Sequence, residues 1–270
     1  MTALFPALHA ELMALLRALS PKDWERPTRA GSWRVRDVAV HLLDGDIRRL
    51  SFQRDGLPAP APDSSGGAES DLLAFLNGLN ASWVSAAARI GPRLLLDFLA
   101  VTGPQVATFF SGLDPEARAF YSVAWAEGES PNWLDTGREY TERWHHQQQI
   151  REAVGAPLLS SRRFLHPVLE ISVRAWPRSL RGIEARPGTL VTVEVAGAAG
   201  DTWTLKRGPE AWQLFAGGAP LCACRVRLDD DTAWRLFFKA VSREQAEARV
   251  SIEGERRLGS VLLGALAVMA

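Results

Sequence analysis

Cysteine is scarce in this sequence, with only Cys222 and Cys224 among 270 residues. One residue separates them in a segment with strand-like alternation, so both side chains are expected on the same face of a strand. That spacing does not suit a structural disulfide, and two thiolates cannot form a four-cysteine zinc site. We therefore interpret them as ordinary strand cysteines and not as a redox pair.

An excess of charge of one sign is also absent, because Lys plus Arg and Asp plus Glu each number 31. No overall field would draw such a protein to nucleic acid or to an anionic membrane. No apolar run reaches the about 20 residues that a membrane span needs, and His9, Glu11 and Arg17 interrupt the N-terminal apolar pattern. We expect a cytoplasmic protein with a small-molecule substrate and no nucleic-acid or membrane partner. The oligomeric state is left open.

Apolar residues recur every three or four positions through roughly the first 180 residues, which is the pattern of helices with one buried face. Gly and Pro at 91–92 and 103–104 interrupt this pattern, the second pair as a possible kink. Ser32 is a candidate helix cap, and the Pro, Ser and Gly residues at 58–67 indicate a surface loop. The predicted helices cover residues 4–19, 32–54, 71–90, 92–113, 135–154 and 164–180.

The period changes to two beyond residue 190, which indicates strands. Asp230 and Ser242 are candidate caps of short helices among them, and residues 258–269 are strongly apolar. The predicted strands cover residues 190–195, 202–206, 211–216, 222–228 and 249–253. We therefore expect an α plus α+β protein, with an N-terminal four-helix bundle at residues 1–160 and a small α+β domain at residues 161–270.

One face of the predicted helix at 135–154 carries an unusual polar stripe. Glu142 and His146 lie one helical turn apart on it, so their side chains can converge on a single ion. Bonds to zinc from such ligands are about 2.0 to 2.2 Å long. A solvated Glu–His pair on an exposed helix is the alternative interpretation.

A second helix provides a third candidate ligand. His41 lies at the margin of an apolar stripe, where an imidazole needs a polar partner, although a lone histidine there is usually only hydrogen-bonded. Together, His41, Glu142 and His146 would form the shell of two histidines and one carboxylate found in catalytic metal sites with open positions. Zinc suits this shell, and iron, nickel or manganese would also fit. His145 competes with His146, which we prefer because it lies nearer the polar stripe.

Two aspartates on the second helix are candidates for orienting a ligand imidazole. Asp46 projects onto the apolar face, and Asp44 lies at helical spacing from His41. For Asp44, the alternative is an ion pair with one of three nearby arginines, Arg36, Arg48 or Arg49.

At these residues the chain resembles the mycothiol-dependent maleylpyruvate isomerase family, whose members carry a DinB-like metal-binding bundle. The matching stretches are Ser32-Trp33-Arg34-Val35-Arg36-Asp37-Val38-Ala39-Val40-His41-Leu42 and Glu142-Arg143-Trp144-His145-His146-Gln147-Gln148-Gln149-Ile150. In that family a Trp-x-Val-x-Asp-Val segment leads into one ligand histidine, and a Glu-x-Trp-x-His segment supplies the other two ligands. The resemblance thus implies His41, Glu142 and His146 as metal ligands.

The resemblance extends to the C-terminal part, where the strands from Leu190 onward and the helix at 231–236 look like the sterol-carrier-protein-like domain of family members. One departure is visible, because the family commonly has an aspartate after the second ligand where this chain has Gln149. Any orienting role for that position is therefore in doubt.

The implied activity is that of a metal-dependent transferase or isomerase, in which one divalent metal ion activates a low-molecular-weight, mycothiol-like thiol for attack on a small electrophile. Two alternatives remain open. One is a zinc-dependent hydrolase that uses no thiol. The other is a non-catalytic, metal-stabilised protein that binds an apolar ligand among aromatic residues of the C-terminal domain, namely Trp203, Trp212, Phe215, Trp234, Phe237 and Phe238.

Overall fold

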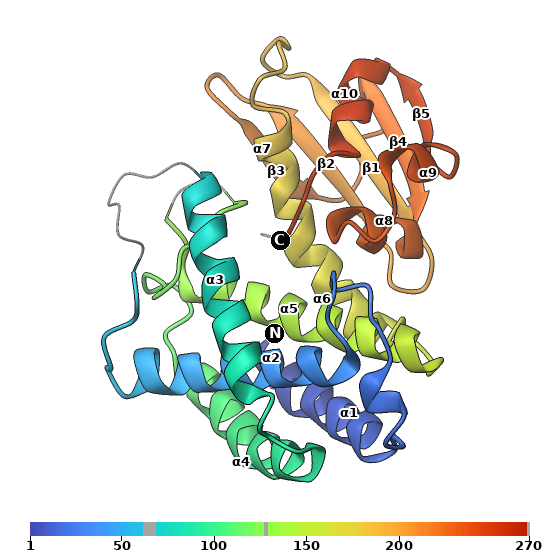
Figure 1. Ribbon diagram of the computed structural model, residues 1–270. Helices are drawn as coiled ribbons and strands as arrows, with labels where there is room; N and C mark the ends of the chain where they lie inside the picture. The colour runs from blue at the N-terminus through green and yellow to red at the C-terminus, as the bar shows by residue number, and fades with distance from the viewer. Residues whose placement is uncertain (62–68, 127–128, 269–270) are drawn as a thin grey trace. The chain divides into compact units, whose positions relative to one another are not determined.

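The structure of the protein, a computed structural model, describes residues 1–61, 69–126 and 129–268 (Figure 1). Backbone contacts divide the chain into two compact units. Unit 1 consists of Met1–Phe120 and Glu142–Leu158, and unit 2 consists of Tyr121–Thr141 and Leu159–Met269. The domain boundary expected between residues 160 and 161 stays a prediction. Residues 62–67 of the predicted loop and Met269 lie outside the described residues.

Unit 1 is a bundle of helices, as the periodicity predicts. It consists of η1 (Thr2–Leu4), α1 (Phe5–Arg17), η2 (Asp23–Glu25), α2 (Val35–Arg48), η3 (Arg49–Arg54), α3 (Glu69–Ala87), α4 (Pro92–Ser111) and the C-terminal part of α5 (Asn132–Val154). The apolar faces of these helices form one core. Its buried members include Leu12, Leu16, Val38, Leu42, Leu43, Leu95, Leu99 and Ile150.

The start of α2 differs from the prediction. The helix begins at Val35, with Arg34 and not Ser32 at the cap, and the Asp37 carboxylate accepts a hydrogen bond of 2.9 Å from the Arg34 backbone N–H. Asp37 thereby satisfies a backbone donor at the helix N-terminus, where a negative charge is also favourable. At its other end α2 continues as the π-helical segment η3, so the helical path reaches Arg54 as expected.

Helix α4 runs without interruption through Gly103 and Pro104, where a kink was a possibility. Gly103 is needed there because a Cβ on it would lie 2.2 Å from Cε1 of His9 on α1. The continuous helix has 20 residues and contains an 18-residue window with a mean hydropathy of 1.4, so by length and composition alone it could cross a membrane. In this structure it packs against α1 and α2.

Unit 2 combines helices with one five-stranded mixed sheet (Figure 1). Its helical segments after α5 are α6 (Arg162–Ser172), η4 (Val173–Ala175), α7 (Trp176–Ser179), α8 (Asp230–Phe237), α9 (Arg243–Glu247) and α10 (Arg256–Leu262). Its strands are β1 (Leu190–Ala196), β2 (Thr202–Arg207), β3 (Trp212–Ala216), β4 (Cys224–Asp229) and β5 (Ser251–Gly254). The strand order is β3-β2-β1-β4-β5, with β1 and β4 parallel and the other pairs antiparallel.

Alternation along β1 gives the sheet two different faces. Val191 and Val193 are buried on the face that α8 and α10 cover. Cys224 pairs with Val191 and faces the same side, and both cysteines are free thiols. The pKa of the Cys224 thiol is raised, chiefly by burial. Cys224 is thus a buried strand cysteine as expected, whereas Cys222 precedes β4, so the prediction of two cysteines on one strand face is wrong for Cys222. Asp229, one residue before the expected Asp230, caps α8 through a hydrogen bond from the Thr232 backbone N–H.

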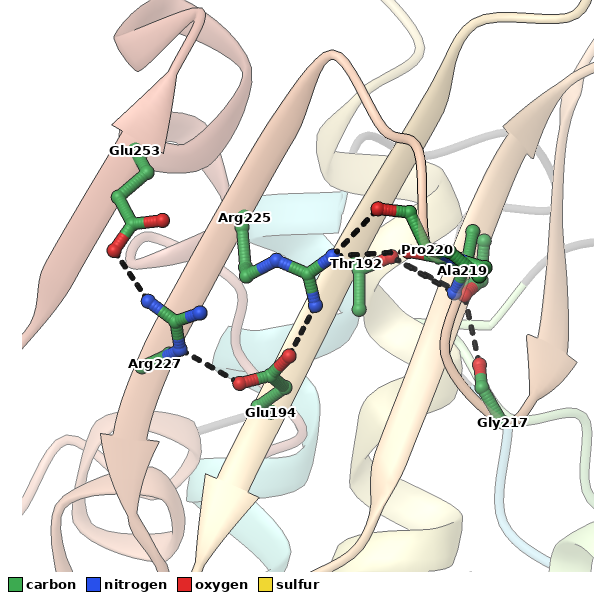
Figure 2. A network of polar contacts seen from close by, with 9 residues as sticks. Thr192, Glu194, Gly217, Ala219, Pro220, Arg225, Arg227 and Glu253 are labelled. Atoms are coloured by element: carbon green, nitrogen blue, oxygen red, sulfur yellow. Dashed lines mark hydrogen bonds and ion pairs between the residues drawn. The ribbon is translucent and has the colours of Figure 1, made fainter.

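The opposite face of the sheet carries a polar network, which Figure 2 shows. Glu194 on β1 accepts hydrogen bonds from Arg225 and Arg227 on β4, and Arg227 also donates to Glu253 on β5. The two arginines are therefore satisfied by neighbouring carboxylates. Their side chains stabilise cross-strand pairs, and no catalytic role is assigned to them.

The connection from β3 to β4, residues 217–223, crosses this polar face (Figure 2). Thr204 donates a hydrogen bond of 2.7 Å to the Gly217 carbonyl, and Thr192 accepts one of 3.3 Å from the Ala219 N–H. Arg225 donates to the carbonyl of Ala219 at 3.0 Å. Both threonines are buried as a result.

Candidate metal centre

Helix α5 presents Glu142 and His146 one turn apart, as the spacing predicts. Oε2 of Glu142 lies 3.5 Å from Nε2 of His146. The two side chains are 28% and 12% exposed, so both are accessible to a small ligand. A carboxylate and an imidazole in this arrangement direct two donor atoms toward the same region.

Helix α2 brings the third predicted ligand to the same place. The ring centroids of His41 and His146 are 4.8 Å apart, with the rings edge to face at 80°. Burial of Val38 and Leu42 in the core sets the rotation of α2 and leaves His41 at the edge of the apolar stripe. Two imidazoles that share a zinc ion tetrahedrally, with bonds of about 2.0 to 2.1 Å, have ring centroids about 5 Å apart. The observed separation is therefore compatible with a shared ion.

Two imidazoles and one carboxylate are suitable ligands for a divalent cation. Their side chains do not form a complete coordination shell in this structure. Among the described residues, no group of three or more His, Cys, Asp or Glu side chains has its donor atoms gathered around one point. The assignment of His41, Glu142 and His146 as ligands stays a prediction.

Gln149 holds the His146 ring in a defined orientation. Its Oε1 lies 2.9 Å from Nδ1 of His146, so the ring can donate an Nδ1–H to the amide oxygen while Nε2 stays outside this contact. Metal-binding histidines in proteins almost always have their second nitrogen held in this way. The side chain whose orienting role was in doubt from the sequence is therefore in contact with the predicted ligand.

His145, the competing candidate, lies in a different environment. It is 8% exposed, and its ring stacks on that of His146 with centroids 5.6 Å apart. Burial, together with the neighbouring His146, lowers the pKa of His145 well below its usual value, so the ring is neutral. Its Nε2 lies 3.4 Å from Nε2 of Gln149. The structure thus places His146, and not His145, with its Nε2 toward Glu142.

Trp33 is a neighbour of the site for which the sequence predicted no role. Its ring centroid lies 5.0 Å from that of His41, at an angle of 49°. The indole is only partly buried and forms an apolar wall beside the imidazole. The signal was present in the sequence, because Trp33 begins the segment that leads to His41.

Both aspartates of α2 form ion pairs with arginines. The Asp44 carboxylate forms an ion pair with Arg48, which was the alternative interpretation, and burial raises its pKa. The Asp46 carboxylate lies 2.6 Å from the Arg143 guanidinium and accepts a hydrogen bond from the Thr102 hydroxyl. Asp46 therefore joins α2, α4 and α5 in the bundle core.

Comparison with known proteins agrees with the resemblance seen in the sequence. Among solved structures, the chain is similar to a crystal structure of a histidine-to-alanine variant of the mycothiol-dependent maleylpyruvate isomerase. The TM-score is 0.53, with 9% identity over 87% of this chain and 86% of that chain. A second crystal structure with the same enzyme name gives a TM-score of 0.49 and 8% identity over the same shares. At this identity the likeness shows the fold, a helical region followed by an α+β unit.

No curated protein sequence matches the chain. Residues 5–151, more than half of the 270 residues, match the family described as the mycothiol maleylpyruvate isomerase N-terminal domain. That stretch contains the Trp33 segment, His41, Glu142 and His146. On this match, the protein belongs to the mycothiol maleylpyruvate isomerase family.

Proposed function

We propose that the protein is a metal-dependent isomerase or transferase that uses a low-molecular-weight thiol on a small electrophile. His41, Glu142 and His146 hold one divalent cation, most simply zinc. The observation that carries this proposal is the contact between the rings of His41 and His146, from two helices far apart in sequence, with Glu142 beside them. Membership of the family supports the enzyme class.

The roles of the chain's own residues follow from the site. A bound divalent cation lowers the pKa of a coordinated thiol or water and so supplies a nucleophile near neutral pH. Gln149 holds the His146 ring through Nδ1. Trp33 covers one side of His41 with an apolar surface that can contact the carbon skeleton of a substrate. The protein then needs no nucleophile of its own.

The reaction class follows from what a thiol can do to a conjugated double bond. Addition of the thiol converts the double bond into a single bond that can rotate, and elimination restores the double bond and the thiol. The substrate is isomerised with no net oxidation or reduction. If instead the substrate carries a leaving group, the sulfur displaces it, the group departs with the bonding electron pair, the thiol proton balances that charge, and the reaction is a transfer. Maleylpyruvate with mycothiol, the pair in the names of the family and of the similar enzyme, is the first to assay.

The binding-module alternative finds less support. Trp203, Trp212 and Phe237 are buried in the packing of unit 2. The apolar cavity beside Trp176, Val193 and Phe237 has a volume of about 10 Å³. That is room for about one water molecule, whereas small-molecule sites are typically about 300 to 1,000 Å³.

Metal analysis of protein purified without a histidine tag tests the proposal. We expect one divalent ion per chain, lost in His41→Ala and in His146→Ala. His166→Ala is the matched control, because His166 lies in unit 2 and its Nδ1 bonds the Ala199 carbonyl. Wild-type protein that is folded, stable and free of metal would contradict the proposal.

An activity assay with and without added thiol separates the reaction classes. Turnover that requires catalytic thiol supports an isomerase, and stoichiometric thiol consumption supports a transferase. Metal-dependent cleavage of esters or amides without thiol would favour the hydrolase alternative.

A further inference from the structure

The Gln149 amide contacts both members of the His145–His146 pair, through opposite ends. Its Oε1 lies 2.9 Å from Nδ1 of His146, and its Nε2 lies 3.4 Å from Nε2 of His145. Gln149 follows His145 by four residues on α5 and His146 by three, so one side chain can reach both rings. Gln149 is itself buried, which keeps water from replacing these contacts.

An amide has a donor end and an acceptor end, and this asymmetry distinguishes the two rings. The amide oxygen only accepts, so Nδ1 of His146 is the donor in that contact, and Gln149 does not contact Nε2 of His146. The amide nitrogen only donates, so the lone pair on Nε2 of His145 is already used. Two adjacent histidines thereby differ in whether Nε2 can bind anything else.

The position of Glu142 agrees with this division. Its Oε2 lies 3.5 Å from the Nε2 of His146, the nitrogen that Gln149 leaves available. Both rings occupy neighbouring positions on one helix, so the spacing to Glu142 alone permits either of them to act. Another residue must therefore determine which of the two histidines acts with Glu142.

We propose that Gln149 is a positioning residue that selects His146 over His145, by holding Nδ1 of His146 as a donor and occupying Nε2 of His145. The choice between two metal ligands rests on the proposed metal centre. The hydrogen bonds of Gln149 to the two rings do not depend on it. A carboxylate at this position would accept from both rings and would force a proton onto Nε2 of His145. The amide is thus chemically distinct from the aspartate that the resembled family commonly has nearby.

Ring-nitrogen NMR spectra of metal-free protein labelled with ¹⁵N-histidine test the structural content. We expect His146 in the Nδ1–H form in the wild type, identified by loss of its signals in His146→Gln. In Gln149→Glu, His146 should stay in this form while His145 changes to the Nε2–H form. In Gln149→Met, His146 should lose its fixed proton position. Spectra unchanged in Gln149→Met would overturn the inference.

Zinc affinity, measured by competition with a chelator, tests the functional meaning. Gln149→Met should weaken zinc binding about 10- to 100-fold, the usual effect of losing a residue that holds a ligand imidazole. Gln149→Glu should retain most of the affinity, because it still accepts from Nδ1 of His146.

Gln147→Met is the matched control for these measurements. Gln147 is another buried amide on α5, but it bonds the Leu8 carbonyl and Arg151 in place of the histidines. Its loss should leave zinc affinity and ring-nitrogen shifts unchanged. Equal weakening in both variants would mean a general packing effect and would overturn the selection by Gln149. A wild type that binds no zinc would reject the metal centre, whereas the NMR spectra would still decide the role of Gln149.

Discussion

The Asp46 carboxylate on α2 lies 2.6 Å from the Arg143 guanidinium on α5, and Asp46 is completely buried. Removing one member of a buried ion pair leaves the other charge without compensation in a medium of low polarity. We expect Asp46→Asn to lower the free energy of unfolding by about 3 to 5 kcal/mol. Urea denaturation measures the change.

An exposed pair in the same unit provides the control for this prediction. Asp55 pairs with Arg54 at 2.6 Å, and both side chains are substantially exposed. Asp55→Asn should change the unfolding free energy far less than Asp46→Asn does, because solvent screens the exposed pair. Similar small losses in the two variants would show that burial of Asp46 does not govern the strength of the interaction.

The close packing of Gly103 against His9 predicts how a substitution there changes stability. A Cβ there would lie 2.2 Å from the His9 ring, so Gly103→Ala should destabilise the protein by about 1 to 3 kcal/mol despite the better helix propensity of alanine. Gly78 on α3 has no heavy atom within 4 Å of the equivalent Cβ. Gly78→Ala should therefore stabilise by about 0.5 to 1 kcal/mol. Thermal unfolding of both variants checks the opposite signs.

His9 makes stability depend on pH. Burial, the largest cause, lowers the pKa of His9 below its ordinary 6.5, and the nearby Asp46 carboxylate opposes this shift. The unfolded chain therefore binds a proton that the folded chain does not, in the range from 6.5 down to the lowered pKa. The stabilisation is complete above pH 6.5 and is lost as the pH falls through that range.

We expect His9→Gln to reduce the decline of unfolding free energy between pH 7 and pH 5. The reduction should be at most about 1.4 kcal/mol per pH unit, the limit for one proton. Chemical denaturation across that range measures it. An identical slope in wild type and variant would mean that His9 does not contribute.

Lys239 adopts a left-handed backbone conformation, with φ of 55°, just after α8. The Ala240 N–H bonds the Arg235 carbonyl at 2.8 Å, as in helix ends that normally place glycine at the left-handed residue. Lys239→Gly should therefore raise the unfolding free energy by about 0.5 to 1 kcal/mol. The reverse change, Gly155→Ala at φ of 72° after α5, should lower it. Two changes of the same sign would contradict this reasoning.

The fold class could be predicted from the sequence because the spacing of apolar residues, and the Gly and Pro residues that interrupt it, reflect local backbone geometry. Leu12 and Leu16 are buried where their spacing predicts, and Val191 and Val193 alternate as a sheet requires. Helix termini were less predictable. A cap depends on which side chain reaches the first backbone donors, and Asp37 reaches back to Arg34 where Ser32 looked suitable.

The candidate site was predictable in its members and less so in its details. Glu142 and His146 share a helix, so their proximity follows from spacing, whereas the approach of His41 depends on how two helices pack. The partners of Asp46 and Gln149 could not be inferred, because each depends on side-chain directions in three dimensions. The family resemblance supplied the connection between His41 and the other two residues.

The chain enters unit 2 at Tyr121 and returns to unit 1 at Glu142. A gene fragment that ends at residue 120 would therefore encode only part of the first unit and would lack both candidate ligands of α5. During ribosomal synthesis, the bundle cannot be completed until residues up to Leu158 have emerged, by which time the first segment of the second unit is already outside the ribosome. Separate production of the two units thus requires rearranging the order of the coding segments, and a single cut cannot achieve it.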